Sequence, residues 1–153
     1  MTHHLKTEDR TPLPAANVRA LIEKHFPNAR SQVGPIDIVS CGGGQAVVRL
    51  PYESRFARPG GTISGPTMFQ LADMTSYVAI ISDLGEAAID AVTTTLTINF
   101  LARPSPEDLL SEVHVLRRGR RQVVCDARIY SGSAHTMVAQ ASCIYALPMA
   151  PLT

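Results

Sequence analysis

Apolar and polar residues alternate along residues 92–101, in the segment VTTTLTINFL. Side chains of a β-strand point alternately to its two faces, so this alternation predicts a strand with Leu96, Ile98 and Phe100 on one face and Thr93 on the other. Similar strand patterns occupy five further segments, residues 36–40, 45–50, 109–116, 122–130 and 136–147. Turn-forming residues separate the last three, which predicts an antiparallel meander.

Two segments show helical spacing instead. Residues 14–26 carry apolar side chains along one side and end at a proline, which predicts a short packing helix. Residues 65–85 are apolar around nearly the whole helical circumference, which predicts a buried helix. Ser64 or Gly65 suits its N-cap, and Pro66 suits its first turn. One long helix beside an antiparallel sheet predicts an α+β fold in which the sheet wraps around the helix.

Composition favours one domain in a reducing compartment. A chain of 153 residues that is 45% hydrophobic can form one core, which we expect at residues 31–148 after an N-terminal extension, residues 1–30. The net charge of +1 gives no general attraction to nucleic acid or membrane. The N-terminus lacks a signal-peptide pattern, so we expect a cytoplasmic protein. Free buried thiols and no metal site are expected from three cysteines without CxxC spacing, Cys41, Cys125 and Cys143.

Asp73 is an acid within the apolar helical segment. It lies about two turns from the helix start, beyond the reach of the N-terminal dipole, where an ionised carboxylate is costly unless it has partners. In one interpretation Asp73 bonds a neighbouring strand or subunit and fixes the packing. In the other it faces a substrate cleft as nucleophile or general base, a common role of carboxylates in apolar surroundings. Periodicity alone leaves both interpretations open.

Three segments carry a resemblance to a known family. The run GGTISGPTMFQLAD is similar to the signature of hotdog-fold acyl-CoA thioesterases of the phenylacetate-pathway (PaaI-like) type, in which a Gly-x-x-His-Gly-Gly turn precedes the central helix. TINFLARP resembles the strand after that helix, and RRGRR resembles the hairpin that meets the coenzyme. The resemblance covers roughly residues 36–147. It implies a hotdog fold, with a sheet wrapped around one central helix, and thioester hydrolysis.

The resemblance also implies roles for individual residues. Asp73 occupies the position of the family's catalytic acid, and Gly65 that of the glycine whose backbone N–H polarises the thioester carbonyl. Thr93 falls where relatives carry a hydroxyl that positions water, contributed from the partner subunit. Ser64 replaces the usual histidine, and a serine can donate a hydrogen bond but cannot carry a proton at neutral pH. Arg58 lies six residues before the family's histidine position, where relatives commonly carry a polar residue.

Substrate contacts are expected at two places. The acyl chain would lie against Met68, Phe69 and Tyr77 of the apolar helix. The basic turn RRGRR concentrates positive charge, and its residues Arg118, Gly119, Arg120 and Arg121 would bind the coenzyme phosphates. A solvated hairpin tip whose charges prevent edge pairing is the alternative. Nucleic acid is not expected, because no aromatic residues interleave with the arginines.

Together these features predict a thioesterase that hydrolyses an acyl-CoA to free acid and coenzyme A. Coenzyme A is then part of the substrate, and no cofactor is required. The alternative is an acyl-CoA-binding hotdog protein with weak or no hydrolytic activity, because Ser64 replaces the imidazole. A single sheet around one helix leaves an open edge and face, so we expect a homo-oligomer, either a dimer or a dimer of dimers.

Overall fold

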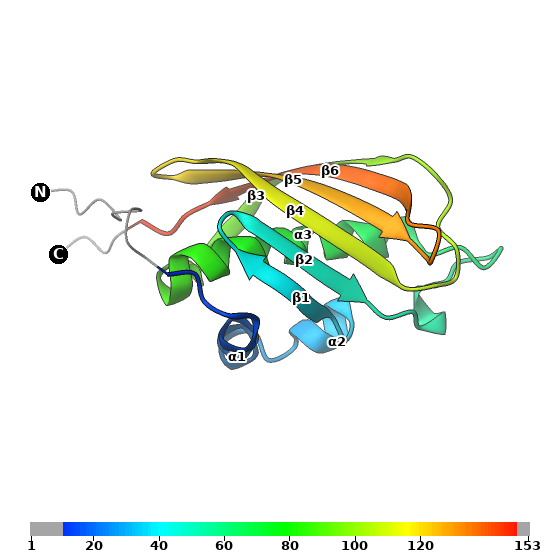
Figure 1. The fold of residues 1–153 in the computed structure, drawn as a ribbon, viewed down its shortest axis with the longest axis horizontal. Helices are drawn as coiled ribbons and strands as arrows, with labels where there is room; N and C mark the ends of the chain where they lie inside the picture. The colour runs from blue at the N-terminus through cyan, green and yellow to red at the C-terminus, as the bar shows by residue number, and fades with distance from the viewer. Residues whose placement is uncertain (1–10, 150–153) are drawn as a thin grey trace, which may run out of the picture.

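A six-stranded antiparallel sheet curves around one long helix (Figure 1). The computed structural model describes residues 11–149. The helices are α1 (Ala15–His25), α2 (Ala29–Val33) and α3 (Gly65–Leu84), with short 3-10 turns η1 (Ser54–Phe56) and η2 (Gly85–Ala88). The strands are β1 (Asp37–Gly42), β2 (Gln45–Leu50), β3 (Val92–Phe100), β4 (Leu109–Arg118), β5 (Gln122–Ser131) and β6 (Thr136–Ala146).

The predicted α+β hotdog fold is confirmed, and the predicted elements are present within a few residues of their expected bounds. The sequence pattern gave no signal for α2, which has only five residues. Part of the expected N-terminal extension, residues 1–10, lies outside the described residues. Among residues 11–149, no helix has both the length and the apolar character that crossing a bilayer would require.

The strand order is β1-β2-β4-β5-β6-β3. Strands β4, β5 and β6 form the predicted meander, whereas β3 crosses to the far edge and pairs only with β6. Large apolar side chains on β3 stay exposed, with Val92 at 59% and Phe100 at 53%. Among the described strands, β3 is thus an edge strand, and its unpaired apolar edge is one that a second chain could cover.

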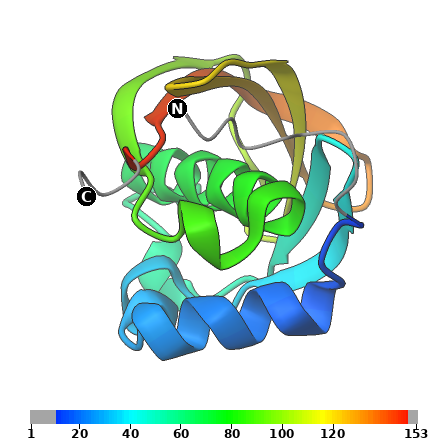
Figure 2. The same cartoon turned by 90° about the vertical axis from the view of Figure 1, so that its left-hand side faces the viewer.

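Helix α3 starts where the sequence predicts. The Ser64 side chain caps it by accepting a hydrogen bond from the Thr67 N–H at 3.3 Å, and Pro66 lies in the first turn, where a missing N–H costs nothing. Leu71, Val78 and Ile81 are fully buried in the concave face of the sheet. Figure 2 shows α3 nearly end-on inside the curve of the sheet, with α1 covering the open side.

One stripe of α3 remains uncovered. Pro66, Phe69 and Gln70 are exposed, and Asp73 and Tyr77 are half-buried. Their spacing of three or four residues places them on one side of the helix. The expectation of burial on all sides is thus wrong along this stripe, which the described elements cover only in part, where β3 and β6 reach Asp73 and Tyr77. The acid lies in the middle of the open stripe.

The cysteines match the expectation of free buried thiols at Cys125 and Cys143, whereas Cys41 is only half-buried. All three are free, and Cys125 and Cys143 are buried opposite each other on β5 and β6. Burial raises the pKa of the Cys125 thiol to about 12 and that of the Cys143 thiol to about 11. These thiols are neutral packing groups at physiological pH.

Candidate active site

Asp73 lies at the centre of a small polar cluster. The Thr93 hydroxyl donates to its Oδ1 at 2.6 Å, and the Tyr145 hydroxyl lies 2.5 Å from the same oxygen and 2.9 Å from the Asp73 carbonyl. Oδ2 accepts no hydrogen bond from residues 11–149, and it is not among their buried unpaired atoms. One oxygen is therefore fixed by two hydroxyl donors while the other remains open. The carboxylate is oriented without being neutralised.

Tyr145 is held rigidly beneath the acid. It is 3% exposed and stacks on Tyr77, with ring centroids 6.2 Å apart, while the Tyr77 hydroxyl donates to the Ile89 carbonyl at 2.6 Å. Burial and the Asp73 charge both raise the pKa of the Tyr145 phenol. The phenol therefore stays protonated and keeps donating to the carboxylate over the physiological pH range.

The expected origin of Thr93 in the partner subunit stays a prediction, and it applies relative to the Gly65 half of the site. Thr93 hydrogen-bonds Asp73 of its own chain, because a bulge in β3 changes the register between Thr93 and Thr95. Strict alternation would place the Thr93 side chain on the outer face of β3 and the Leu96 side chain on the other face. The extra residue turns Thr93 inward beside Tyr145, its pairing partner on β6. Sequence reasoning did not identify Tyr145 as part of the site. The one feature that could have pointed to it is the presence of a tyrosine hydroxyl at a buried position of the last strand.

Replacing Tyr145 by phenylalanine is expected to lower the free energy of unfolding by about 1–2 kcal/mol at pH 7, because Oδ1 loses a donor. The difference should shrink above pH 10. The unfolded tyrosine ionises near its ordinary pKa of 10.0, whereas the folded-state pKa is raised, so the stability from this phenol is complete below pH 10 and declines as the pH rises further. Urea unfolding between pH 7 and 10.5 measures both effects.

Tyr130→Phe is the matched control for that experiment. Tyr130 is half-buried, and its hydroxyl makes no hydrogen bond to the described part of the chain. This variant shows how unfolding responds to the loss of a tyrosine hydroxyl that has no hydrogen-bond partner among residues 11–149. Equal pH slopes for wild type and Tyr145→Phe would contradict the assigned environment of Tyr145.

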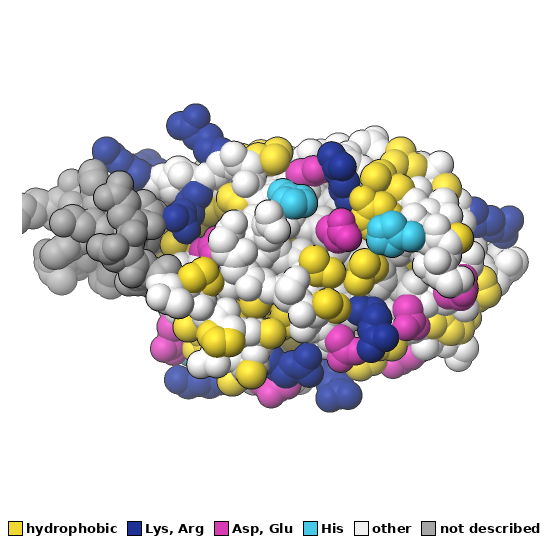
Figure 3. Space-filling model, viewed as in Figure 1, with side chains coloured by type: hydrophobic (Ala, Val, Ile, Leu, Met, Phe, Trp, Pro, Cys, Tyr) yellow, Lys and Arg dark blue, Asp and Glu magenta, His cyan; other side chains and the backbone are white. Residues whose placement is uncertain are grey.

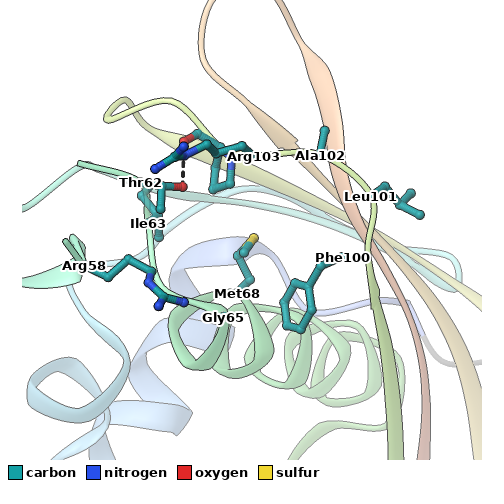
Figure 4. A pocket seen from close by; sticks show the side chains of 10 residues that line it. Arg58, Thr62, Ile63, Gly65, Met68, Phe100, Leu101, Ala102 and Arg103 are labelled. Atoms are coloured by element: carbon teal, nitrogen blue, oxygen red, sulfur yellow. Dashed lines mark hydrogen bonds between the residues drawn. The ribbon is translucent and has the colours of Figure 1, made fainter. Parts of the chain in front are cut away.

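A second cluster surrounds the start of α3. The Gly65 N–H donates to no group of residues 11–149, and a pocket of about 430 Å³ opens beside it (Figure 4). A Cβ at position 65 would lie 3.1 Å from Cζ of Phe100, so glycine allows this ring to lie against the helix start. The pocket is lined by Arg58, Thr62, Ile63, Gly65, Met68, Phe100, Leu101, Ala102, Arg103 and Pro104.

The predicted residues divide between the two clusters. Arg58 and Met68 line the pocket beside Gly65, as expected for substrate contacts, whereas Tyr77 lies with Tyr145. Phe69 is 41% exposed on the open stripe of α3 and does not line the pocket. Ser64 stands at the helix start, but its hydroxyl is bonded to Thr67 Oγ1 at 2.8 Å as part of the cap.

Asp73 and Gly65 are too far apart to act together within one chain. Eight residues of α-helix separate them, which corresponds to about 12 Å along the axis of α3. A group bonded to the Gly65 N–H cannot also contact the Asp73 carboxylate of the same chain. The residues predicted to be catalytic thus lie in two separate clusters within one chain.

The basic turn is the tip of the β4–β5 hairpin. The Gly119 N–H donates to the Gln122 carbonyl at 2.8 Å and closes the turn. Within residues 11–149 no ion pair involves the turn's arginines, Arg117, Arg118, Arg120 and Arg121. Lys and Arg side chains gather in Figure 3 at the end of the molecule where Figure 1 places this hairpin.

The hairpin lies toward the C-terminal end of α3. Gly44 contacts both Val115, just before the hairpin, and Asp83, near the C-terminal end of α3. Val123, just after it, pairs with Tyr145. The twenty residues of α3 span about 30 Å, so Gly65 lies at the opposite end of the helix. Within residues 11–149, no three His, Cys, Asp or Glu side chains cluster as a metal site would require.

An antiparallel sheet curved around one central helix, with an acid on that helix and a free N–H at its start, defines the hotdog-fold class. The chain belongs to the thioesterase superfamily, whose sequence model matches residues 60–138. The expected likeness to PaaI-like thioesterases is thereby confirmed at the level of fold and family.

Individual relatives agree with this family. A crystal structure from Silicibacter, provisionally described as a thioesterase, is 33% identical, covers 92% of this chain and 95% of its own, and has a TM-score of 0.81. A Streptococcus mutans protein bound to acetyl CoA is 25% identical, and the match covers 74% of this chain and 89% of the S. mutans chain with a TM-score of 0.67. A Saccharolobus solfataricus protein provisionally described as an esterase is 32% identical over 60% of this chain, which spans 64% of that relative.

Proposed function

We propose that this chain is an acyl-CoA thioesterase whose active site is built by two copies of the chain. The observation that carries the proposal is the division of the expected catalytic residues into two half-sites. Thioester hydrolysis needs a donor at the carbonyl oxygen and a nucleophile at the carbonyl carbon, each within about 3 Å of the reacting atom. Asp73 and Gly65 meet that condition only if they come from different chains.

A symmetric dimer can bring the half-sites together. The open stripe of α3 carries Asp73 at its centre, and the unpaired edge of β3 ends at Phe100 beside Gly65. A two-fold axis that pairs these surfaces would place Asp73 of each chain opposite Gly65 of the other and would create two equal sites. Dimerisation would also cover the exposed apolar side chains of β3.

The residues suggest a division of labour in hydrolysis. The Gly65 N–H binds the carbonyl oxygen and stabilises the negative charge that develops on it. Asp73 Oδ2 either attacks the carbonyl carbon or removes a proton from a water molecule that attacks it, while Thr93 and Tyr145 hold Oδ1 in place. If Asp73 is the base, collapse of the tetrahedral intermediate breaks the C–S bond, releases the free acid, and passes the proton taken from water to the departing thiolate of coenzyme A. If Asp73 is the nucleophile, the same collapse leaves a mixed anhydride on Asp73, which water hydrolyses to release the acid and restore the carboxylate, with one proton from that water going to the thiolate.

Two further surfaces suit the rest of the substrate. The unpaired arginines of the β4–β5 hairpin can form bidentate contacts with coenzyme phosphates. The pocket beside Gly65 has an apolar wall that can receive an acyl group. Acetyl CoA bound to the Streptococcus mutans relative supports this class of ligand. Three free thiols fit a reducing, cytoplasmic setting.

An acyl-CoA-binding protein without turnover is the second candidate. It is favoured by one observation: the Ser64 hydroxyl, which replaces the family histidine, is engaged in the helix cap and cannot act as an acid at neutral pH. Thiol release from a panel of acyl-CoAs, read with a thiol reagent, separates the two candidates. We expect saturable turnover of at least one acyl-CoA. Saturable binding by calorimetry without thiol release would establish the binding protein instead.

A further inference from the structure

The pocket beside Gly65 carries two positive charges and no acid. Arg58 reaches it from the loop before α3, and Arg103 from the segment after β3 (Figure 4). Neither guanidinium forms an ion pair with the described residues. The other lining residues are mostly apolar. The pocket therefore combines an apolar wall with positive charge that no acid among residues 11–149 compensates.

The backbone segments that carry these two exposed arginines are joined to each other. The Arg58 N–H donates to the Thr62 carbonyl at 2.9 Å, and the Thr62 hydroxyl donates to the Pro104 carbonyl at 3.1 Å, which ties the two segments together. Gly60 has a φ of +96°, and a Cβ there would lie 2.5 Å from Nη2 of Arg103. A glycine at this turn thus leaves room for the guanidinium. The charges belong to an organised site.

We propose that this pocket receives an acyl group that carries a carboxylate at its far end, so that the substrate is the coenzyme A monothioester of a dicarboxylic acid. The inference rests on the proposed function, because it places the thioester carbonyl at the Gly65 N–H. Methylene groups would lie against Met68 and Phe100, and the terminal carboxylate would pair with Arg58 and Arg103.

Coenzyme phosphates are a poorer match for these arginines. The long pantetheine arm separates the sulfur from the nearest phosphate, so no phosphate can lie beside a thioester carbonyl held at Gly65. The β4–β5 hairpin provides a separate cationic surface for the phosphates. A volume of about 430 Å³ lies toward the small end of ligand pockets, which favours an acyl chain of a few carbons.

The test compares adipyl-CoA with hexanoyl-CoA, which have equal chain length and differ in the terminal carboxylate. We expect kcat/KM to be higher for adipyl-CoA by roughly 10- to 100-fold, the range typical of charge-assisted hydrogen bonds. Arg58→Met and Arg103→Met should each reduce this ratio toward one. The control Arg30→Met, which removes an exposed arginine of α2, should preserve the ratio.

Equal kcat/KM values for adipyl-CoA and hexanoyl-CoA in the wild type would overturn the proposal. Arginine variants that raise KM equally for both substrates would also overturn it, because they would assign the arginines to the coenzyme. Failure of the proposed function is detected separately with two thioethers that cannot be hydrolysed, S-(5-carboxypentyl)-CoA and S-hexyl-CoA. If no acyl-CoA is turned over, calorimetry still decides. If the wild type binds S-(5-carboxypentyl)-CoA more tightly than S-hexyl-CoA and Arg103→Met does not, the proposed carboxylate site is supported. Equal affinities of the wild type for the two thioethers refute it.

Discussion

Asp73→Asn is expected to lower kcat for acyl-CoA hydrolysis by roughly 10²- to 10⁴-fold, the usual contribution of a positioned general base. An amide can still accept from Thr93 and Tyr145, so the fold and the local hydrogen bonds should persist. What is lost is the charge on Oδ2, the oxygen that has no protein partner among residues 11–149. Steady-state thiol release over a substrate series measures the loss.

The matched control is Asp83→Asn. Asp83 lies on the same helix and accepts from the Gly44 N–H at 2.8 Å, near the far end of α3 from Gly65. Its replacement should change kcat by less than about twofold, as expected for a substitution outside the site. Equal activity of wild type and Asp73→Asn would remove Asp73 from the mechanism. Single turnover in ¹⁸O-water then tests the nucleophilic role: label in the Asp73 carboxylate requires a mixed anhydride that water opens at the Asp73 carbonyl carbon, and a general base leaves the carboxylate unlabelled.

Much of the fold can be predicted from local sequence signals. Alternation identifies the strands, the apolar run identifies α3, and Ser64 with Pro66 identifies its first turn, because each feature depends on neighbours in the chain. The position of β3 beside β6 could not be predicted in this way. It depends on pairing between residues far apart in sequence, for which the alternating pattern of residues 92–101 gives no partner.

The candidate site shows the same limit at the level of single residues. Strict alternation puts Thr93 on the outer face, and only the bulge between Thr93 and Thr95 brings it to Asp73. Tyr145 reaches the acid through the register of β6, which no local pattern specifies. By contrast, the separation of Asp73 from Gly65 follows from helical rise alone. The sequence therefore already contained the reason why one chain cannot hold both halves of a thioesterase site.

Mixed dimers should recover activity that neither parent variant has. Asp73→Asn removes the charge from one half-site, and Gly65→Val blocks the other, because its Cβ would meet the Phe100 ring at 3.1 Å. In a heterodimer of these two chains, one shared site combines both lesions and the second combines the intact Asp73 with the intact Gly65. Two affinity tags on co-expressed chains isolate the heterodimer, whose thiol-release rate should be about half that of the wild type.

The reciprocal pairing gives the opposite result and completes the argument. If both substitutions are placed in one chain and paired with a wild-type chain, each shared site contains one lesion, and activity should fall to that of the single variants. A site within one chain predicts the reverse, since the wild-type chain would keep its own complete site and about half the activity. Circular dichroism of each purified variant establishes folding before the comparison. An inactive first heterodimer with an active second one would refute the shared site. We expect the opposite result, because the separation of Asp73 and Gly65 along α3 prevents both residues of one chain from reaching one thioester.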